Sequence, residues 1–600
     1  MRARWVGLLL GLLVLTGCAT VPGSSDVTVL RRVGDAAEPS APPGPARGAG
    51  PLETVRGWVQ ASGSTAERHE VARRFLTAPA AGGWDDGAAP VVVSDRVDTV
   101  YADRPVPTGV SAVRIRATRL GTLSPTGAFL PESGALDLVV ELVVQNGQWR
   151  ISSLPAGTVV RRSDLRANTR PVRAWFVGAT SGLPVSETRY LQVSPIRSLA
   201  ARTLDLLTSG PSASLAGAVT GALPPRATLR ATDALDPSGA LGVDIADAGP
   251  LDDVGRNRIA RQVVLTLAGI GVPRVRLTAD GAPLVPGRSE LGVGDVLAGL
   301  PARVLENRDL PLDPAGAGSP AAPDPRAALV VSGGRVSRAG DPATEVVPDA
   351  GPATAQSASE SSGDEVAVVA VDPSGSRLLV GPTGASPTPV PLAARTLTRP
   401  TWSPIAPEVW TVADGTRVVR VVRAAAGTLL PLDVDAGGLA GAGGISAMRL
   451  SPDGARVAAV AGGRVLVGVV VREPAGGVRV TSVQALRPGP TPDAVGTPGS
   501  VTTTDALVGV LDAAWARSDR LVAVGGRTGH PVSLVSVDGL DLDDAPTLNL
   551  TPPVTAVAAT PGRPVLAVDQ GGLWSLLDDG SGVWRFVNGG AAGSVPAYPG

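Results

Sequence analysis

The clearest reactive group in this chain is the thiol of Cys18, the only cysteine among 600 residues. Arg2 and Arg4 lie near the start of the sequence, and an almost uninterrupted apolar run follows from Trp5 to Leu15. A membrane-spanning helix needs about 20 apolar residues, so this run is too short to cross a bilayer. A charged start followed by a short apolar core is typical of an export signal. The sequence therefore predicts that the residues ahead of the cysteine direct the chain across a membrane.

The residues Leu15, Thr16, Gly17 and Cys18 resemble the bacterial lipobox. The resemblance implies a signal peptide at 1–17 that is cut off, and a Cys18 thiol that is alkylated with diacylglycerol. Lipidation would use the one thiol of the chain, which has no second cysteine for a disulfide. Two or three acyl chains anchor a protein firmly, whereas one binds only marginally. We expect a protein anchored through acylated Cys18 in the lipid bilayer, on the outer face of the cytoplasmic membrane. The alternative is an ordinary secreted protein with a chance cysteine.

The composition restricts the other catalytic chemistry. The chain contains no lysine, which excludes a P-loop phosphate lysine, a Schiff base and a Ser-Lys pair. Only two histidines are present: His69 in a polar stretch that resembles the solvent face of a helix, and His530 in a loop. No Gly-x-Ser-x-Gly motif accompanies them. We therefore expect no enzymatic activity, no cofactor and no histidine or cysteine metal site, while metal sites built from carboxylates remain open.

Length and charge limit the class of protein further. A chain of 600 residues is long enough for about three to four domains. The formal net charge is −1, from 53 basic and 54 acidic residues, so the sequence indicates no basic surface for nucleic acid. After the signal segment, no apolar stretch approaches the length of a membrane-spanning helix.

The elements begin after a region that is rich in Pro, Gly, Ala and Ser. Residues 18–50 show no sustained period and are predicted to form a flexible tether. Residues 52–59 and 71–76 carry apolar side chains at helical spacing, and Pro79 is expected to end the second helix. Residues 51–165 are thus predicted to form a small α+β domain that resembles folds related to nuclear transport factor 2. Its expected strands lie at 91–93, 112–117, 136–144 and 148–152.

A second small α+β domain is predicted over 166–303. Amphipathic helices are expected at 196–207 and 259–267, and Gly210-Pro211 ends the first of them. The order of elements, the string Leu-Pro-Pro-Arg-Ala-Thr-Leu at 223–229 and the final Asp-Gly turn resemble the GerMN domain of germination and lipoprotein families. These are core and turn residues, so none is expected to be catalytic. The expected strands lie at 172–177, 189–191, 241–245 and 275–277.

A Pro- and Ala-rich linker at 304–326 precedes a region of short apolar runs separated by Gly, Asp and Pro. A turn pattern repeats in this region: residues 371–380 align with 450–458, and a looser copy lies at 559–568. Such repeats resemble β-propellers related to TolB and WD40 proteins, because one hairpin turn recurs in every blade. Residues 327–588 are therefore predicted to form an all-β propeller of five to seven blades, with a β-sandwich as the alternative. The residues from 589 to the end are expected to form a disordered tail.

Two kinds of side chain decide what a propeller could do. Trp402 and Trp515 occupy equivalent places in the repeat, and we expect both in the blade core. Stacking tryptophans in an open cleft would favour a ligand-binding protein instead. Some propellers are hydrolases, and such chemistry would need clustered carboxylates at the channel mouth. The available carboxylates, Asp414, Asp453, Asp519 and Asp569, are expected to be ordinary turn residues.

The full arrangement resembles the LpqB lipoprotein family of actinobacteria. The segments Thr54-Val55-Arg56-Gly57-Trp58 and Ala72-Arg73-Arg74-Phe75-Leu76-Thr77 are similar to the N-terminal signature of that family. The resemblance implies that the chain binds the extracellular domain of a membrane sensor histidine kinase of the MtrB–MtrA two-component type. It would modulate signalling tied to the envelope and cell division. The alternative is an envelope lipoprotein that binds a sugar, a peptidoglycan fragment or a lipid.

Overall fold

The computed structural model describes ten stretches of the chain, beginning at Gly44. The predicted signal peptide 1–17, most of the tether 18–50 and the linker 304–326 lie outside the described residues. None of the helices in the described part is both long and apolar enough to cross a membrane. The described residues are 44–63, 69–88, 90–192, 199–300, 327–347, 354–361, 363–486, 507–525, 529–577 and 581–599.

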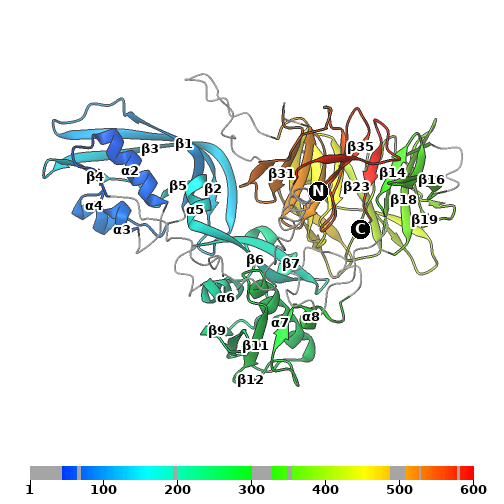
Figure 1. Cartoon of the computed structure of the whole chain (residues 1–600), viewed down its shortest axis with the longest axis horizontal. Coiled ribbons are helices and arrows are strands. Elements are labelled where there is room, and N and C mark those ends of the chain that lie inside the picture. The colour runs from blue at the N-terminus through cyan, green and yellow to red at the C-terminus, as the bar shows by residue number, and fades with distance from the viewer. Residues whose placement is uncertain are drawn as a thin grey trace, which may run out of the picture. The chain divides into compact units, whose positions relative to one another are not determined.

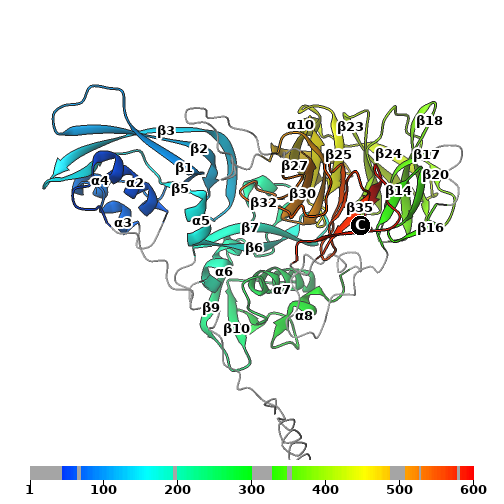
Figure 2. The ribbon, with the colours of Figure 1, turned by 45° about the horizontal axis from the view of Figure 1, so that its top comes forward.

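The first domain is a five-stranded sheet that packs against short helices (Figure 2). The sheet has the order β4-β3-β2-β1-β5, antiparallel except for the parallel pair β1–β5. The predicted first helix is confirmed: α2 buries Val55, Trp58 and Val59 on one face, at the spacing of helical turns. The elements are α2 Pro51–Ser62, α3 Glu70–Arg73, α4 Ala78–Gly83, β1 Val91–Tyr101, β2 Val110–Leu123, β3 Phe129–Gln145, β4 Gln148–Ser153 and β5 Val159–Arg161.

The predicted second helix is only partly correct. Helix α3 ends at Arg73, because Phe75 and Leu76 pair with the backbone of Ile151 in β4 instead of continuing the helix. Pro79 does not end a helix but lies in the first turn of the next one, α4, where proline is favoured. Phe75 packs so closely against α2 that a Cβ at Gly57 would lie 2.5 Å from its ring.

The second domain places helices against two sheets. Helix α7 packs on β6 of the sheet β7-β6-β8 and on β11 of the sheet β12-β11-β10-β9. Its Ile259, Val263 and Leu267 are fully buried, as their spacing predicts. The elements are α5 Arg162–Asn168, β6 Thr169–Gly178, β7 Pro184–Gln192, α6 Leu199–Ser209, η3 Ala213–Leu215, β8 Val219–Thr220, β9 Thr228–Leu235, β10 Ala240–Ala246, α7 Asp253–Ala268, β11 Arg274–Ala279, β12 Ala282–Pro283, β13 Leu291–Gly292 and α8 Val293–Leu297.

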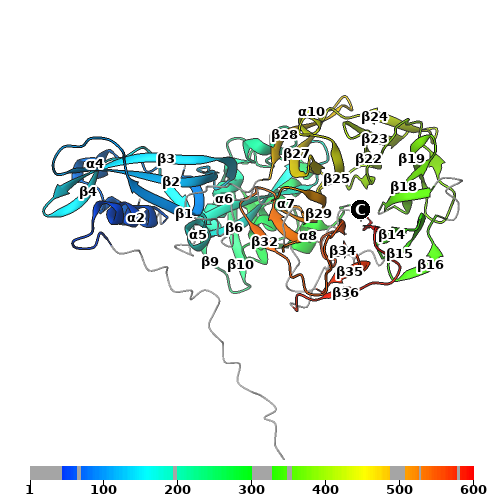
Figure 3. The ribbon, with the colours of Figure 1, turned by 90° about the horizontal axis from the view of Figure 1, so that it is seen from above.

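The remaining strands form six four-stranded antiparallel sheets, the blades of a β-propeller, which Figure 3 shows around their ring. Blade 1 contains β14–β16 and β37, and blades 2 to 6 follow in chain order from β17–β20 to β33–β36. The strands are β14 Leu329–Ser332, β15 Arg335–Arg338, β16 Asp341–Glu345, β17 Thr354–Glu360, β18 Glu365–Asp372, β19 Gly375–Pro382, β20 Thr388–Pro389, β21 Thr401–Trp402, β22 Glu408–Ala413, β23 Arg417–Arg423, β24 Leu429–Asp433, β25 Ile445–Leu450, β26 Arg456–Ala461, β27 Arg464–Arg472, β28 Val478–Ala485, β29 Val510–Arg517, β30 Arg520–Gly525, β31 Val532–Ser536, β32 Leu542–Asp544, β33 Ala556–Ala558, β34 Leu566–Val568, β35 Leu573–Leu576, β36 Trp584–Phe586 and β37 Val595–Ala597; the short helix α10, Gly437–Ala440, lies between β24 and β25.

The end of the chain closes the ring. Strand β37 pairs antiparallel with β14, with Val331 opposite Val595 and Leu329 opposite Ala597. It supplies the innermost strand of blade 1, whose Ala597 lines the propeller cavity. The C-terminus accordingly lies within the propeller (Figure 1). The expectation of a disordered tail from residue 589 is therefore wrong, because these residues give β14 the partner that its inner edge needs.

The predicted repeat does consist of blade hairpins, but the alignment of residues 371–380 with 450–458 pairs two turns that occupy different positions in their blades. The turn at Ser451–Arg456 connects the first and second strands of blade 4, whereas the turn at Asp372–Gly375 connects the second and third strands of blade 2. Both turns use an Asp or Ser side chain to cap a tight connection, so their sequences are alike although their places in the blade differ.

Candidate functional site

The predicted lipid-attachment residues, Cys18 with Leu15, Thr16 and Gly17, lie outside the described residues. The structure therefore places none of them.

The two histidines do not form a catalytic pair. The expectation of a solvent-facing His69 is wrong, because only 6% of the residue is exposed and its ring lies 5.8 Å from that of Trp84. His530 lies in the propeller, with Nδ1 3.1 Å from a carboxylate oxygen of Asp544. Within the described ranges, no group of three or more His, Cys, Asp or Glu residues could hold a metal ion.

The four aspartates considered for propeller chemistry form turn contacts. Asp414 accepts hydrogen bonds from the backbone of Arg395 and the next residue, and Asp453 contacts Ser451 and Arg456. Asp519 pairs with Arg517, and Asp569 accepts from the backbone of a tight turn and from the indole of Trp574. None of the four lines the cavity on the propeller axis.

A cavity of about 160 Å³ lies on the axis of the propeller. All six blades contribute to its wall through their innermost strands. In blades 2 to 6 the innermost strand turns into the second strand of the blade, and we call the end of the propeller where these turns lie the mouth end. Residues of several of these turns also line the cavity. The six innermost strands contribute Ser359, Trp402, Leu450, Trp515, Val557 and Ala597.

A buried ion pair across the ring forms the inner end of this cavity. The guanidinium of Arg399, just ahead of β21, donates to Asp512 of β29 over 2.7 Å. It also donates to the carbonyls of Val557, at 3.0 Å, and Pro596, so one side chain of blade 3 contacts blades 5, 6 and 1. Arg449 of blade 4 approaches the other oxygen of Asp512 at 3.4 Å.

The buried environment of Asp512 keeps its carboxylate and the guanidinium of Arg399 in fixed positions. Burial raises the pKa of Asp512, while Arg399 and the backbone N–H groups of Val557 and Ala513 oppose this rise. A buried carboxylate without such donors would be costly, so the arginine and the carboxylate hold each other in place.

The tryptophans form the apolar wall of the cavity. As predicted, both are buried: Trp402 is 5% and Trp515 is 3% exposed. Their indole N–H groups donate across blade boundaries, to the carbonyls of Ser359 and Arg449 at 3.3 and 3.1 Å. The rings therefore present hydrocarbon to the cavity, with their polar atoms already bonded.

Two residues that line the cavity, Ser359 and Arg399, each have one fully buried polar atom without a partner in the described chain. The hydroxyl of Ser359 and the Nε–H of Arg399 find no hydrogen-bond partner among the residues that the structure describes. Buried polar groups of this kind are rare in folded proteins. The sequence alone does not reveal this site, because Arg399 and Asp512 are 113 residues apart and neither belongs to a motif.

The second domain contacts the propeller at the mouth end. The hydroxyl of Tyr190 in β7 donates to Asp538 over 2.9 Å, in the turn between the third and fourth strands of blade 5. In an antiparallel blade this turn lies at the same end as the turn between the first and second strands. Arg456 of blade 4 donates to the carbonyl of Ser186 over 3.0 Å. We call these contacts the domain junction.

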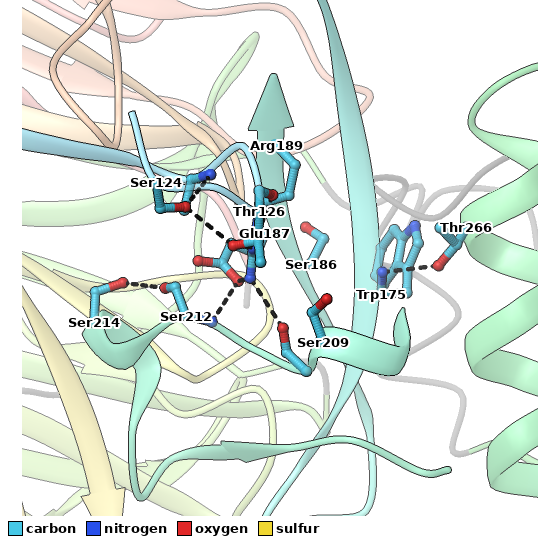
Figure 4. A network of polar contacts seen from close by, with 12 residues as sticks. Ser124, Thr126, Trp175, Ser186, Glu187, Arg189, Ser209, Ser212, Ser214 and Thr266 are labelled. Atoms are coloured by element: carbon cyan, nitrogen blue, oxygen red, sulfur yellow. Dashed lines mark hydrogen bonds and ion pairs between the residues drawn. The ribbon is translucent and has the colours of Figure 1, made fainter. Parts of the chain in front are cut away.

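Figure 4 shows a polar network that joins the first domain to the same strand, β7. Arg189, which is fully buried, donates to the hydroxyl of Thr126 over 2.7 Å and to Glu187 over 2.7 Å. The second acceptor, Glu187, also receives the backbone N–H of Ser212 at 3.1 Å. Strand β7 is thus held on one side by the first domain and on the other by the propeller.

The fold and the axial site define a multidomain β-propeller protein, in which two α+β domains precede six blades. The family model described as "Lipoprotein LpqB, N-terminal domain" matches residues 44–166, and "Lipoprotein LpqB beta-propeller domain" matches residues 334–599. Lipoprotein LpqB of Mycolicibacterium smegmatis is 33% identical over 625 aligned positions, which cover 99% of each chain. That of Mycobacterium paratuberculosis is 32% identical and covers 100% of each chain. The chain belongs to the LpqB lipoprotein family.

Solved structures include a partial match to the tandem GerMN domains of the sporulation protein GerM from Bacillus subtilis. The match has 20% identity and a TM-score of 0.19, and it covers 21% of this chain and 47% of that one.

Proposed function

We propose that this protein is anchored through acylated Cys18 on the outer face of the cytoplasmic membrane, where it binds and modulates a sensor histidine kinase. The proposal is carried by the similarity to LpqB lipoproteins over almost the full length of both chains. The kinase, of the MtrB–MtrA type that acts in envelope and division signalling, is the partner implied by the family resemblance. The signal peptide 1–17 and the acyl chains on the cysteine belong to the same proposal.

The domain assignments extend this proposal. We propose that the second domain is of the GerMN type, on the order of its strands and helices. The first domain, with helices against a five-stranded sheet, is proposed to be of the nuclear transport factor 2 type. Domains that pack on one another present a broad surface for a protein partner.

In-cell crosslinking and pull-down of the tagged protein test the proposal, with a Cys18→Ala variant that cannot be lipidated as the control. We expect a sensor histidine kinase among the crosslinked proteins of the anchored form and a strong reduction with Cys18→Ala. Membrane fractionation of the same cells should show the variant released from the membrane. Crosslinked material without any kinase would contradict the proposed partner.

A second candidate function is supported by the axial cavity. The cavity offers an envelope lipoprotein an enclosed space, walled in part by Trp402 and Trp515, for part of a sugar, a peptidoglycan fragment or a lipid. Crosslinking that recovers envelope glycans or lipids in place of a kinase would favour this function.

A further inference from the structure

The two faces of the sheet in the first domain are covered by different parts of the molecule. Val93 and Val159 belong to the apolar cluster that the sheet shares with α2. Val92 and Val160, their neighbours along the same two strands, point to the opposite face, because side chains alternate along a strand. On that face lies a second apolar cluster, which we call the socket. The first domain and α5 contribute Val92, Leu120, Leu123, Phe129, Val160 and Leu165 to it.

A turn of the propeller fills the socket. Leu540, in the turn between β31 and β32 of blade 5, is fully buried there. Among the described residues, Leu540 packs in the socket and not in the apolar clusters of blade 5. Asp538 accepts from the backbone N–H of Leu540 at 3.0 Å, and the hydroxyl of Ser536 accepts from that of Asp541 at 2.9 Å. The turn therefore holds its own shape when it presents the leucine to the first domain.

Polar contacts beside the socket join the same parts of the molecule. The backbone N–H of Tyr190 in β7 donates to the carbonyl of Gly127, in the turn between β2 and β3, over 2.7 Å. The network of Figure 4 adds side-chain contacts next to this bond. Arg166 of α5 pairs with Asp541 of the propeller turn, with Nε 2.8 Å from the carboxylate. The first domain is thus held by β7 on one side of the socket and by blade 5 on the other.

The covalent connection leaves the first domain free to turn. The chain passes from the first domain to the second once, through the seven residues of α5 (Figure 2). The start of α5 stays with the first domain, because the backbone N–H of Ser163 donates to Asp95 at 2.7 Å. Residues at the ends of elements, such as Asn168 and Thr169 between α5 and β6, can absorb the backbone rotation of a hinge. The orientation of the first domain therefore depends on its non-covalent contacts.

We propose that the turn 536–541 of blade 5 is a latch, which seats Leu540 in the socket and keeps the first domain against the propeller. Its release lets the first domain rotate about the connection of α5 to β6 and uncovers the socket. The inference goes beyond the proposed kinase partner and does not depend on it. If the proposed lipid anchor is attached ahead of the first domain, the latch also sets how the propeller is presented to the membrane.

Double electron–electron resonance between two spin labels tests the latch. The chain that begins after Cys18 contains no cysteine, so Ser133→Cys in the first domain and Ala475→Cys in blade 4, both exposed, can be labelled selectively. We expect one narrow distance distribution for this parent chain. Leu540→Asp should widen it at least about twofold, because loss of a buried leucine shifts the ratio of latched to released molecules by about tenfold to a hundredfold.

The matched control for this substitution is Leu548→Asp. It introduces the same charge in the connection between β32 and β33, at a leucine that is 66% exposed. Leu548→Asp should leave the distribution narrow, whereas the milder Leu540→Ala should widen it in the same direction as Leu540→Asp but less.

Gly127→Ala tests the opposite side of the socket without a change in the propeller. An added Cβ would lie 2.7 Å from the carbonyl oxygen of Tyr190, so the first domain should be displaced and the distribution should widen. Gly109→Ala is its control in the same domain. Both glycines have a positive φ, 74° and 82°, but a Cβ at Gly109 has nothing within 4 Å. The control therefore carries the same backbone strain without the contact.

Circular dichroism and thermal unfolding of each variant show that its domains are folded. A distribution that stays narrow in both Leu540→Asp and Gly127→Ala would overturn the inference, because other contacts would then fix the first domain. A distribution that is already wide in the parent chain would also overturn it, as would equal widening by Leu548→Asp or Gly109→Ala. Crosslinking of a kinase is measured separately, so the two proposals fail separately.

Discussion

At the scale of single residues, the carboxylate of Glu408 is buried in the propeller among three donors, Arg420, Arg472 and Trp410. It is 3% exposed and pairs with Arg472 and, at 3.1 Å, with Arg420, while Trp410 donates its indole N–H over 2.8 Å. Burial alone would raise the pKa of Glu408, but the two arginines and the indole hold it below the ordinary value of 4.5. The carboxylate thus stays ionised where an unfolded chain would already take up a proton.

We expect Glu408→Gln to lower the free energy of unfolding at neutral pH by about 3–5 kcal/mol, because both guanidiniums lose their counter-charge in a buried place. In the wild type, the contribution of Glu408 is present above pH 4.5 and is lost as the pH falls through its lower pKa in the folded protein. Urea unfolding between pH 3 and 7 should therefore show a smaller loss of stability in acid for the variant than for the wild type.

Glu473→Gln is the control for this substitution. It removes the same charge from an exposed ion pair, in which the side chains of Arg479 and Glu473 are 51% and 49% exposed. Its effect should stay below about 1 kcal/mol at every pH. An equally large effect of both substitutions would show that net charge, and not the buried pair, sets the stability.

A site residue can be predicted from the sequence when it belongs to a contiguous motif, and not when its partners are distant along the chain. Cys18 follows a contiguous signal, so one stretch of the chain is enough to select it. Arg399 and Asp512 meet only because the ring brings blades 3 and 5 to a common axis. Their charges look like ordinary surface charges until the closed propeller is known, so residue types alone could not assign them.

At the scale of elements, the strands that alternation and apolar period indicated coincide with strands of the structure, as do three of the four helices that they indicated, whereas many short strands and the helices α4, α5, α8 and α10 were not indicated. The second helix is shorter than predicted. Phe75 and Leu76 have helical spacing, but their backbone pairs with Ile151 of β4 instead of continuing the helix. Strand β37 was missed because Val595–Ala597 is short and lies among glycines, and its partner β14 is more than 200 residues away. Periodicity reports local preference, whereas pairing of this kind depends on the rest of the ring.

The closing strand makes a prediction of its own. A chain that ends at Gly593 lacks β37, which exposes the inner edge of β14 and the apolar side chains that pack there, Leu329 and Val331. We expect a loss of at least about 3 kcal/mol in stability and rapid proteolysis within blade 1. A chain that ends at Tyr598 keeps the strand and should match the wild type. Equal protease resistance of both truncated chains would contradict the role of β37.

At the scale of the whole molecule, the domain junction should couple the unfolding of the second domain to that of the propeller. Burial raises the pKa of Asp538, whose carboxylate accepts from Tyr190, from Ser536 and from the backbone of Leu540. A shared apolar cluster surrounds this contact and contains Phe129 of the first domain, Tyr190 of the second and Leu540 of the propeller.

We expect Tyr190→Phe to destabilise the protein by about 1–3 kcal/mol, because a buried carboxylate loses one of its donors. Differential scanning calorimetry should show a broader transition, or two transitions, as the domains uncouple. Tyr101→Phe removes the same hydroxyl from a side chain that is 60% exposed and should leave the transition unchanged. A Tyr190→Phe transition that coincides with that of the wild type would show that the hydroxyl does not link the domains.

The pairing of β14 with β37 also determines the order in which the molecule can be completed. The ribosome makes β37 about 260 residues after β14, an interval of roughly 15 to 50 seconds at ordinary rates of synthesis. Blade 1 therefore remains incomplete, with the inner edge of β14 unpaired, during the synthesis of the other five blades. This holds even if those blades have already folded. Proteases and chaperones that meet the nascent chain have this interval in which to recognise it, and a ribosome that stalls near the 3′ end of the message would prolong it.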